Sequence, residues 1–217
     1  MDLDMFTHEA TQTNLQTLAY RGVRVIEPGT GLLASGLHGK GRMAEPEEIA
    51  DEVAAHFASD LPWAGKKVLI TAGLTHEPMD AVRFLGNRSS GKMGFALAEV
   101  LANAGAKVTL IAGPVHLATP DRVHARIDVQ TAIEMNDAVQ QRWKDMDWGI
   151  ACAAVSDFRP AQSSAEKWHR GDMPEAIELA ENPDILAGMG NDKSEHQTLV
   201  GFALESDDGL ASAQGKM

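Results

Sequence analysis

A short apolar run that ends in a glycine restricts the fold of this sequence more than any other feature. Residues 68–72 (VLITA) are apolar and partly β-branched, which predicts a buried parallel strand, and Gly73 follows them directly. Further along the chain, SSG at 89–91 comes just before an amphipathic run at 93–104. Free N–H groups and hydroxyls at a helix N-terminus favour an anion. The strand, the glycine turn and the helix start together predict a site for a nucleotide phosphate.

Strand and helix patterns alternate after the first strand. Further apolar strands are predicted at 108–112 and 148–155, and a second amphipathic helix at 131–143 begins with Thr131 and Glu134 in capping-box spacing. This alternation predicts an α/β fold with a Rossmann-like, doubly wound, mainly parallel sheet and helices on both faces. Ligands of such sheets bind outside the carboxyl ends of the strands.

The beginning of the chain does not follow this pattern. It contains a predicted strand at 23–26 and a predicted helix at 46–57, which has proline and acidic residues in its first turn. The stretch LPWAG at 61–65 then interrupts the helical pattern. We therefore expect two domains, one at 1–60 and one at 61–217.

Charge and composition restrict the classes of ligand and location. The 217 residues carry a formal net charge of −12, so nucleic acid and anionic membranes are not expected as partners, and an anionic ligand needs a local cationic pocket. No apolar run approaches the ~20 residues of a membrane span. The first residues lack the features of a signal peptide, so we expect a cytoplasmic protein without a membrane segment. The single cysteine, Cys152, lies in an apolar run and is interpreted as a small core residue.

Two common nucleotide motifs are absent from the sequence. A dinucleotide fingerprint would place G-x-G-x-x-G after the first strand, but that turn holds only Gly73, which disfavours NAD. A P-loop would follow its strand at once, whereas Gly91 and Lys92 stand well beyond 68–72 and are followed by Met93. Ordinary helix capping by Ser-Ser-Gly remains an alternative to phosphate binding.

Five segments resemble, in order and spacing, the phosphopantothenate-cysteine ligase family. They are TAGLTHEPMD (71–80), VRFLGNRSSGKMG (82–94), AAVSDFRP (153–160), NPDIL (182–186) and VGFA (200–203), and the similarity covers about residues 62–217. Before them, ATQTNL (10–15) and GKGRMAEP (39–46) resemble the end of phosphopantothenoylcysteine decarboxylase, a flavodoxin-like domain fused ahead of the ligase in bifunctional bacterial coenzyme A enzymes. The resemblance implies the rear part of such a fusion protein, shortened at both ends.

The family joins 4'-phosphopantothenate to cysteine. CTP first converts the carboxylate into an acyl-cytidylate, and cysteine then displaces CMP. The resemblance further implies Mg²⁺ with CTP, a homodimer of ligase domains, and a higher oligomer in the full-length fusion. FMN would bind only in the full-length decarboxylase domain, so no decarboxylation is expected from this polypeptide alone.

Two other classes of function remain as alternatives. The first is a non-catalytic nucleotide-binding or assembly fragment. The second is an NAD-dependent short-chain reductase, which is disfavoured because Tyr20 is the only tyrosine and forms no Tyr-x-x-x-Lys motif. The residues alone do not distinguish CTP from ATP.

Carried over residue by residue, the resemblance implies catalytic roles for Asn87 and Lys167. The residues matched to phosphopantothenate are Asn87, Ala153, Ala154 and Asp157. The residues matched to CTP are Gly73, Ser89, Gly91, Gly94, Ala151, Cys152, Ala153, Asp157, Lys167, Asn182, Pro183, Asp184, Ile185, Phe202 and Lys216.

Four positions depart from the family pattern, and one of them is Asp2, which falls where the Pro-Ala-Met-Asn motif of the decarboxylase would have asparagine. His169 and Arg170 replace two lysines of the basic stretch that begins at Lys167. Ser35 stands where many relatives carry an acid-donating cysteine in the decarboxylase domain. The metal ligands are not assigned, although the carboxylate of Asp157 is a candidate partner for a ribose or for Mg²⁺.

Overall fold

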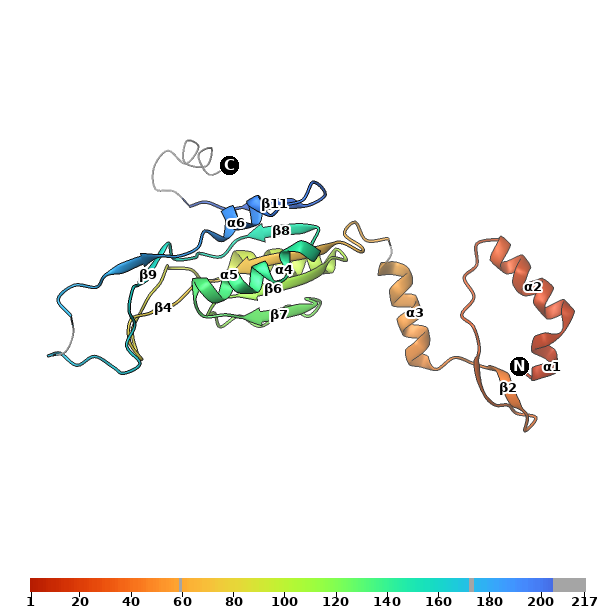
Figure 1. The fold of residues 1–217 in the computed structure, drawn as a ribbon. Coiled ribbons are helices and arrows are strands. Elements are labelled where there is room, and N and C mark those ends of the chain that lie inside the picture. Colours follow the sequence, from red (N-terminus) through yellow and green to blue (C-terminus); the bar gives the residue numbers. More distant parts are fainter. Residues whose placement is uncertain (59, 172–173, 205–217) are drawn as a thin grey trace. The chain divides into compact units, whose positions relative to one another are not determined.

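The computed structural model describes residues 1–58, 60–171 and 174–204. The chain divides into two compact units, Met1–Asp60 and Leu61–Met217, and each is described by itself (Figure 1).

A five-stranded parallel sheet forms the centre of the second unit. Strand β3 (Lys67–Ala72) lies in the middle, with β6 (Lys107–Ala112) and β7 (Ala125–Asp128) on one side, and β8 (Trp148–Ala151) and β11 (Thr198–Gly201) on the other. All four pairings are parallel. The two apolar runs predicted as buried strands are therefore confirmed as β3 and β6.

Helices cover both faces of this sheet. Helix α4 (Lys92–Asn103) packs on one face, while α5 (Ala132–Gln140), the short 3-10 helix η1 (Trp143–Asp145) and α6 (Ile185–Asn191) pack on the other. Because neighbouring strand residues point to opposite faces, Val68 and Ile70 contact the α4 side and Leu69 contacts the α5 side. The predicted doubly wound α/β fold is confirmed.

The helix predicted at 131–143 begins at the predicted capping box, but it ends earlier than predicted. The Thr131 side chain accepts a hydrogen bond from the backbone N–H of Glu134, and the Glu134 side chain completes the capping box. The helix ends at Gln140 and the chain continues into η1, where the buried Trp143 packs under α6.

Two short antiparallel pairs lie beyond the carboxyl ends of the central strands. One pairs β4 (Glu77–Pro78) with β5 (Phe84–Leu85), and the other pairs β9 (Phe158–Pro160) with β10 (Leu179–Glu181). In Figure 1, β4 and β9 run out from the same end of the sheet.

The predicted strand at 148–155 is too long, because β8 ends at Ala151. The backbone N–H groups of Cys152 and Ala153 both lie 3.3 Å from the hydroxyl of Thr71. The Thr71 hydroxyl adds these contacts to the backbone hydrogen bond from the N–H of Cys152 to the carbonyl of Thr71, at 3.2 Å.

The first unit contains three helices and a hairpin. Its elements are α1 (Leu3–Thr7), α2 (Glu9–Tyr20), β1 (Gly29–Leu32), β2 (His38–Arg42) and α3 (Pro46–Ala58). The predicted helix at 46–57 is confirmed as α3. The predicted strand at 23–26 is wrong, because β1 pairs with β2 and leaves that run without a neighbouring strand in the described residues.

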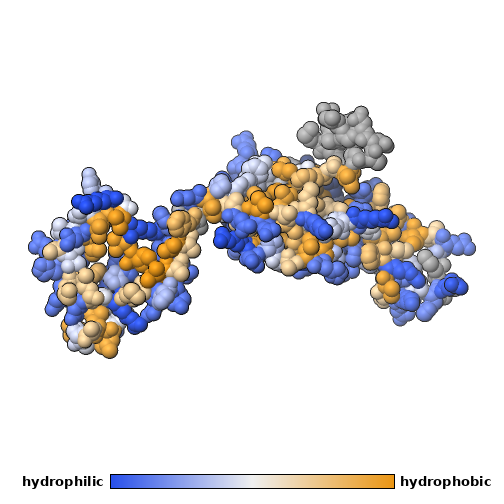
Figure 2. Space-filling view, turned by 180° about the vertical axis from the view of Figure 1, so that it is seen from behind, coloured by the Kyte–Doolittle hydropathy of each residue, from blue (hydrophilic) through white to orange (hydrophobic). Residues whose placement is uncertain are grey.

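Apolar side chains of the first unit are mostly exposed. Leu33 and Ala44 are its buried apolar residues within the described part. Figure 2 shows orange, apolar areas on its surface, and Met43 and Phe57 are among the exposed side chains. A core of this size contributes little stability by itself. Within the described ranges of the whole chain, no helix combines the length and apolar character needed to cross a bilayer.

Candidate active site

The strand order defines where a ligand site is expected. From β3 the chain crosses to β6 on one side of the sheet, and it later returns to β8 on the other side. The segments that leave the carboxyl ends of β3 and β8 therefore diverge, and crevices at such switch points bind ligands in open α/β sheets. Gly73 follows β3 and Cys152 follows β8, so both lie at this point.

Three predicted glycines meet where α4 begins. Gly73 and Gly91 have φ angles of +84° and +74°, which favour glycine. A Cβ atom on Gly91 would lie 3.2 Å from the Cα atom of Gly73, and one on Gly94 would lie 2.5 Å from the Cβ atom of Ala72. Side chains at these positions would separate the first turn of α4 from the end of β3.

A depression of about 260 Å³ lies at this junction. It is lined by Arg88, Ser89, Ser90, Gly91, Lys92, Met93, Gly94 and Cys152. Helix α4 has Gly91 as its N-cap and no side-chain cap, and the Ser89 hydroxyl instead accepts a hydrogen bond from the N–H of Gly91 at 3.3 Å. A free helix N-terminus beside two cations, Arg88 and Lys92, suits an anionic ligand.

Asn87 connects this junction to the segment after β8. Its side-chain amide nitrogen donates to the carbonyl oxygens of Ala154 at 3.3 Å and Val155 at 2.9 Å. The N–H of Ala154 in turn donates to the carbonyl of Gly73 at 2.8 Å. Asn87 is therefore not a cap of α4, and its Oδ1 atom accepts no hydrogen bond from the described residues.

Two threonines that were not among the predicted site residues also shape this site. Thr71 is 3% exposed and holds the N–H groups of Cys152 and Ala153, while the fully buried Thr75 accepts from the N–H of Ser156 at 3.1 Å. A threonine at the end of an apolar strand fits ordinary β propensity, so the sequence offered no separate signal for these roles.

Cys152 is half-buried: it packs against the core on the α4 side and also lines the depression. Partial burial raises the pKa of its thiol above the ordinary value of 9.0. The thiol is therefore protonated at neutral pH, and a role as nucleophile is disfavoured.

Two residues matched to CTP, Asn182 and Asp184, hold the backbone of the loop after β8 and the start of α6. The N–H of Asn182 donates to the carbonyl of Asp157 at 2.8 Å, and the Asn182 side chain donates to the carbonyl of Ser156 at 2.8 Å. The Asp184 side chain caps α6 by accepting from the N–H of Ala187 at 2.9 Å. In this structure these two side chains support the loop and the helix next to the site.

Four other residues matched to CTP do not line the depression. Ile185 is buried, Pro183 is exposed, and Phe202 is half-exposed with its N–H donating to the carbonyl of Ala151 at 3.2 Å. Lys167 is exposed and is not part of the wall of the depression. Lys216 lies outside the described residues.

Asp157 is the residue predicted to bind a divalent cation. Asp157 is exposed just beyond β8. Within residues 1–58, 60–171 and 174–204, no group of three or more His, Cys, Asp or Glu side chains is arranged to hold a metal ion. Mg²⁺ commonly uses one or two carboxylates together with substrate phosphates, so the carboxylate of Asp157 stays the predicted candidate ligand.

A five-stranded parallel sheet with helices on both faces, and with Arg88 and Lys92 beside the helix N-terminus at its switch point, defines a Rossmann-like α/β domain with a candidate anion site. Residues 63–217 match the family described as DNA/pantothenate metabolism flavoprotein C-terminal domain, and the chain belongs to this family. The resemblance found in the sequence is thereby confirmed.

Relatives with curated names extend the similarity to the whole chain. The Coenzyme A biosynthesis bifunctional protein CoaBC of Vibrio cholerae is 46% identical over 220 residues, which cover 100% of this chain and 54% of that protein. The protein of the same name from Escherichia coli K12 is 44% identical over 211 residues, covering 95% and 52%. A Cysteine/Cysteine sulfinic acid decarboxylase of an unknown prokaryotic organism is 48% identical, covering 100% and 62%. The chain thus spans 52–62% of the length of these relatives.

Solved structures agree with the fold. A crystal structure of the C-terminal domain of a CoaBC protein has a TM-score of 0.63 and 40% identity, over 72% of this chain and 74% of that chain. A Cab2 variant in complex with phosphopantothenate-cysteine has a TM-score of 0.56, over 79% of this chain and 77% of that one. At 17% identity the second likeness concerns the fold alone.

Proposed function

We propose that this chain carries a phosphopantothenate-cysteine ligase domain that uses CTP. The observation that carries the proposal is the meeting of Gly73, the start of α4 and Asn87 at the switch point of the sheet. The family, and the names of relatives that are 44–46% identical, support coenzyme A biosynthesis as the setting.

The proposed reaction has two steps, and each has a defined leaving group. A carboxylate oxygen of 4'-phosphopantothenate attacks the α-phosphorus of CTP, and pyrophosphate leaves. The amine of cysteine then attacks the acyl carbon, the bond to CMP breaks, and the amine loses a proton. Both steps need two polyanions held side by side, so positioning and charge neutralisation are the main tasks of the protein.

Several of the predicted residues have a task in this scheme. The N–H groups around Ser89 and Gly91 bind phosphate oxygens at the start of α4, and Lys92 adds a positive charge. Asn87 contacts the acyl group without adding charge, and Lys167 contacts the triphosphate. Mg²⁺ would be held by Asp157 and phosphate oxygens, and it would neutralise charge on the departing pyrophosphate.

The wider context also belongs to the proposal. We infer that the first unit is the end of a decarboxylase domain whose body binds FMN in a longer protein, and that its exposed apolar side chains are covered there. Ser35 would occupy the proton-donor position of that domain, where it donates to Asp2 at 2.8 Å. We further propose a cytoplasmic homodimer of ligase domains that forms a higher oligomer in the longer protein.

Thermal unfolding with different nucleotides tests the nucleotide assignment. A ligand that binds only the native state at about 100 times its Kd adds about 2.7 kcal/mol, which raises the midpoint of a chain of this size by about 5–11 °C. We expect this shift with CTP and Mg²⁺, and none with NADH. A shift with NADH alone, or equal shifts with both, would contradict the proposal.

A further inference from the structure

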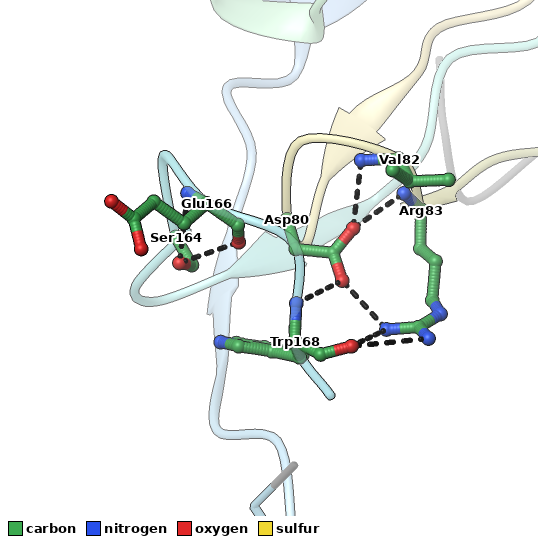
Figure 3. A network of polar contacts seen from close by, with 6 residues as sticks. All are labelled: Asp80, Val82, Arg83, Ser164, Glu166 and Trp168. Carbon is green, nitrogen blue, oxygen red and sulfur yellow. Dashed lines mark hydrogen bonds and ion pairs between the residues drawn. The ribbon is translucent and has the colours of Figure 1, made fainter. Parts of the chain in front are cut away.

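Asp80 joins two segments that are far apart in the sequence (Figure 3). Its side chain has no exposed area and lies in the turn between β4 and β5. Its Oδ1 atom accepts hydrogen bonds from the N–H groups of Val82 at 2.8 Å and Arg83 at 2.7 Å. Its Oδ2 atom accepts from the N–H of Trp168 at 3.2 Å, 88 residues later, and from the Arg83 guanidinium at 2.6 Å. One oxygen closes the turn, and the other holds the second segment.

The second segment, residues 164–168, has further attachments to the turn between β4 and β5. Both terminal nitrogens of Arg83 donate to the carbonyl oxygen of Trp168, at 3.4 and 3.5 Å. The N–H of Ser164 donates to the carbonyl of Met79 at 3.0 Å, and the Ser164 side chain closes a local turn with Glu166. The chain around Trp168 is thus fixed at two points, and Asp80 supplies the charge at one of them.

These two segments carry both residues with predicted catalytic roles. Lys167 directly precedes Trp168, and Asn87 follows β5 after a single residue. The side chain of a lysine is long and flexible, so anchoring its backbone limits the region that the ammonium group can reach. We propose that Asp80 is a positioning residue, which fixes the backbone at Trp168 so that Lys167 meets the nucleotide triphosphate. The identity of that ligand rests on the function proposed above.

The proposed role requires the charged form of Asp80. Burial by itself raises the pKa of this carboxyl, but hydrogen bonds from three backbone N–H groups and the Arg83 guanidinium bring it below 3.8. Asp80 is therefore ionised at neutral pH. An asparagine has only one oxygen, and its NH₂ group would face N–H donors. Because asparagine suits turns, Asp80→Asn can keep the local bonds while it loses the bond to Trp168.

Limited proteolysis tests this attachment independently of any ligand. Lys167 and Arg170 are exposed trypsin sites on either side of the anchored backbone. Loss of a charge-assisted hydrogen bond should speed cleavage at both sites in Asp80→Asn by about tenfold or more. Asp147→Asn is a matched control, because the Asp147 carboxylate also links distant segments by accepting from the N–H of Lys67 at 2.8 Å. Unchanged cleavage in Asp80→Asn, or equal acceleration in both variants, would overturn the proposal.

Amide hydrogen exchange on the unaltered chain gives a second test if Asp80→Asn fails to fold. The Trp168 amide should exchange at least about tenfold more slowly than the neighbouring amides of His169 and Arg170, because a charged acceptor holds it. Equal exchange at the three amides would show that the bond does not persist in solution, and the proposal would fall.

A double-mutant cycle on nucleotide affinity tests whether Asp80 acts through Lys167. Asp80→Asn and Lys167→Ala should each weaken CTP binding more than CMP binding, and the double variant should lose little more than the stronger single variant. Additive losses would contradict action through Lys167. If trypsin cleavage responds but neither variant alters CTP affinity, the attachment stands, whereas the triphosphate role of Lys167 and the positioning proposal both fail.

Discussion

The side-chain amide nitrogen of Asn87 lies 2.9 Å from the carbonyl oxygen of Val155, which comes 68 residues later in the chain. This contact joins the segment before α4 to the segment after β8. The residues predicted to bind the nucleotide phosphates and those predicted to bind phosphopantothenate therefore meet at Asn87.

Two substitutions at Asn87 should differ in their effects. Asn87→Asp places a negative charge beside two anionic substrates, and at ~4 Å with an effective dielectric of about 20 each charge pair repels by about 4 kcal/mol before screening. Even a quarter of this slows turnover about fivefold. Asn87→Ala removes only hydrogen bonds, so it should slow turnover with CTP affinity nearly intact.

Titration calorimetry with phosphopantothenate and steady-state turnover separate the two variants. The aspartate variant should lose phosphopantothenate affinity, and the alanine variant should lose less. Asn103→Asp, at the exposed end of α4, controls for the added charge. If alanine were worse than aspartate for this affinity, Asn87 would be a structural residue and not a substrate contact.

Gly91→Ala should damage both folding and nucleotide binding. Its φ of +74° costs an L-residue roughly 1–2 kcal/mol, and the added methyl group would meet Gly73 and Val115 within 3.2 Å. We expect a lower urea midpoint and weaker CTP binding. Gly190→Ala in α6, where the nearest atom is 3.9 Å away, should lower neither the urea midpoint nor CTP affinity. A Gly91→Ala chain with wild-type stability would refute the close approach of α4 to β3.

The stability of the chain in acid should depend on Asp80. Its pKa is lowered in the folded state, so its contribution is complete above the unfolded value of about 3.8 and is lost as pH falls through the lower folded value. Urea midpoints of the wild type and Asp80→Asn should therefore differ at pH 5 and converge as the pH falls below about 3.8. A gap that stays constant or widens in acid would contradict the lowered pKa.

The parts of the fold that could be predicted have local causes. Strand β3 follows from a run of four apolar residues and one β-branched threonine, and the start of α5 follows from the spacing of Thr131 and Glu134. The run at 23–26 has β-forming residues but no partner strand among the described residues, and a strand does not form without one.

The part of the site that directly follows a strand could be predicted from the sequence. Gly73 and Gly91 do meet at the carboxyl end of β3. The hydroxyl of Thr71 accepts from the backbone after β8, and the carboxylate of Asp80 holds Trp168. These contacts act across 81 and 88 residues and leave no periodic pattern. Lys167 lies away from the depression wall, and its contact with a triphosphate stays a prediction.

Mass detection of the acyl-nucleotide tests the central claim most directly. The chain is incubated with 4'-phosphopantothenate, Mg²⁺ and either CTP or ATP, first without cysteine and then with it. The account predicts a phosphopantothenoyl-cytidylate with CTP, formed with pyrophosphate, and its conversion to phosphopantothenoylcysteine and CMP when cysteine is added. CTP binding without any acyl-cytidylate or ligated product would contradict the ligase assignment and would leave a nucleotide-binding module.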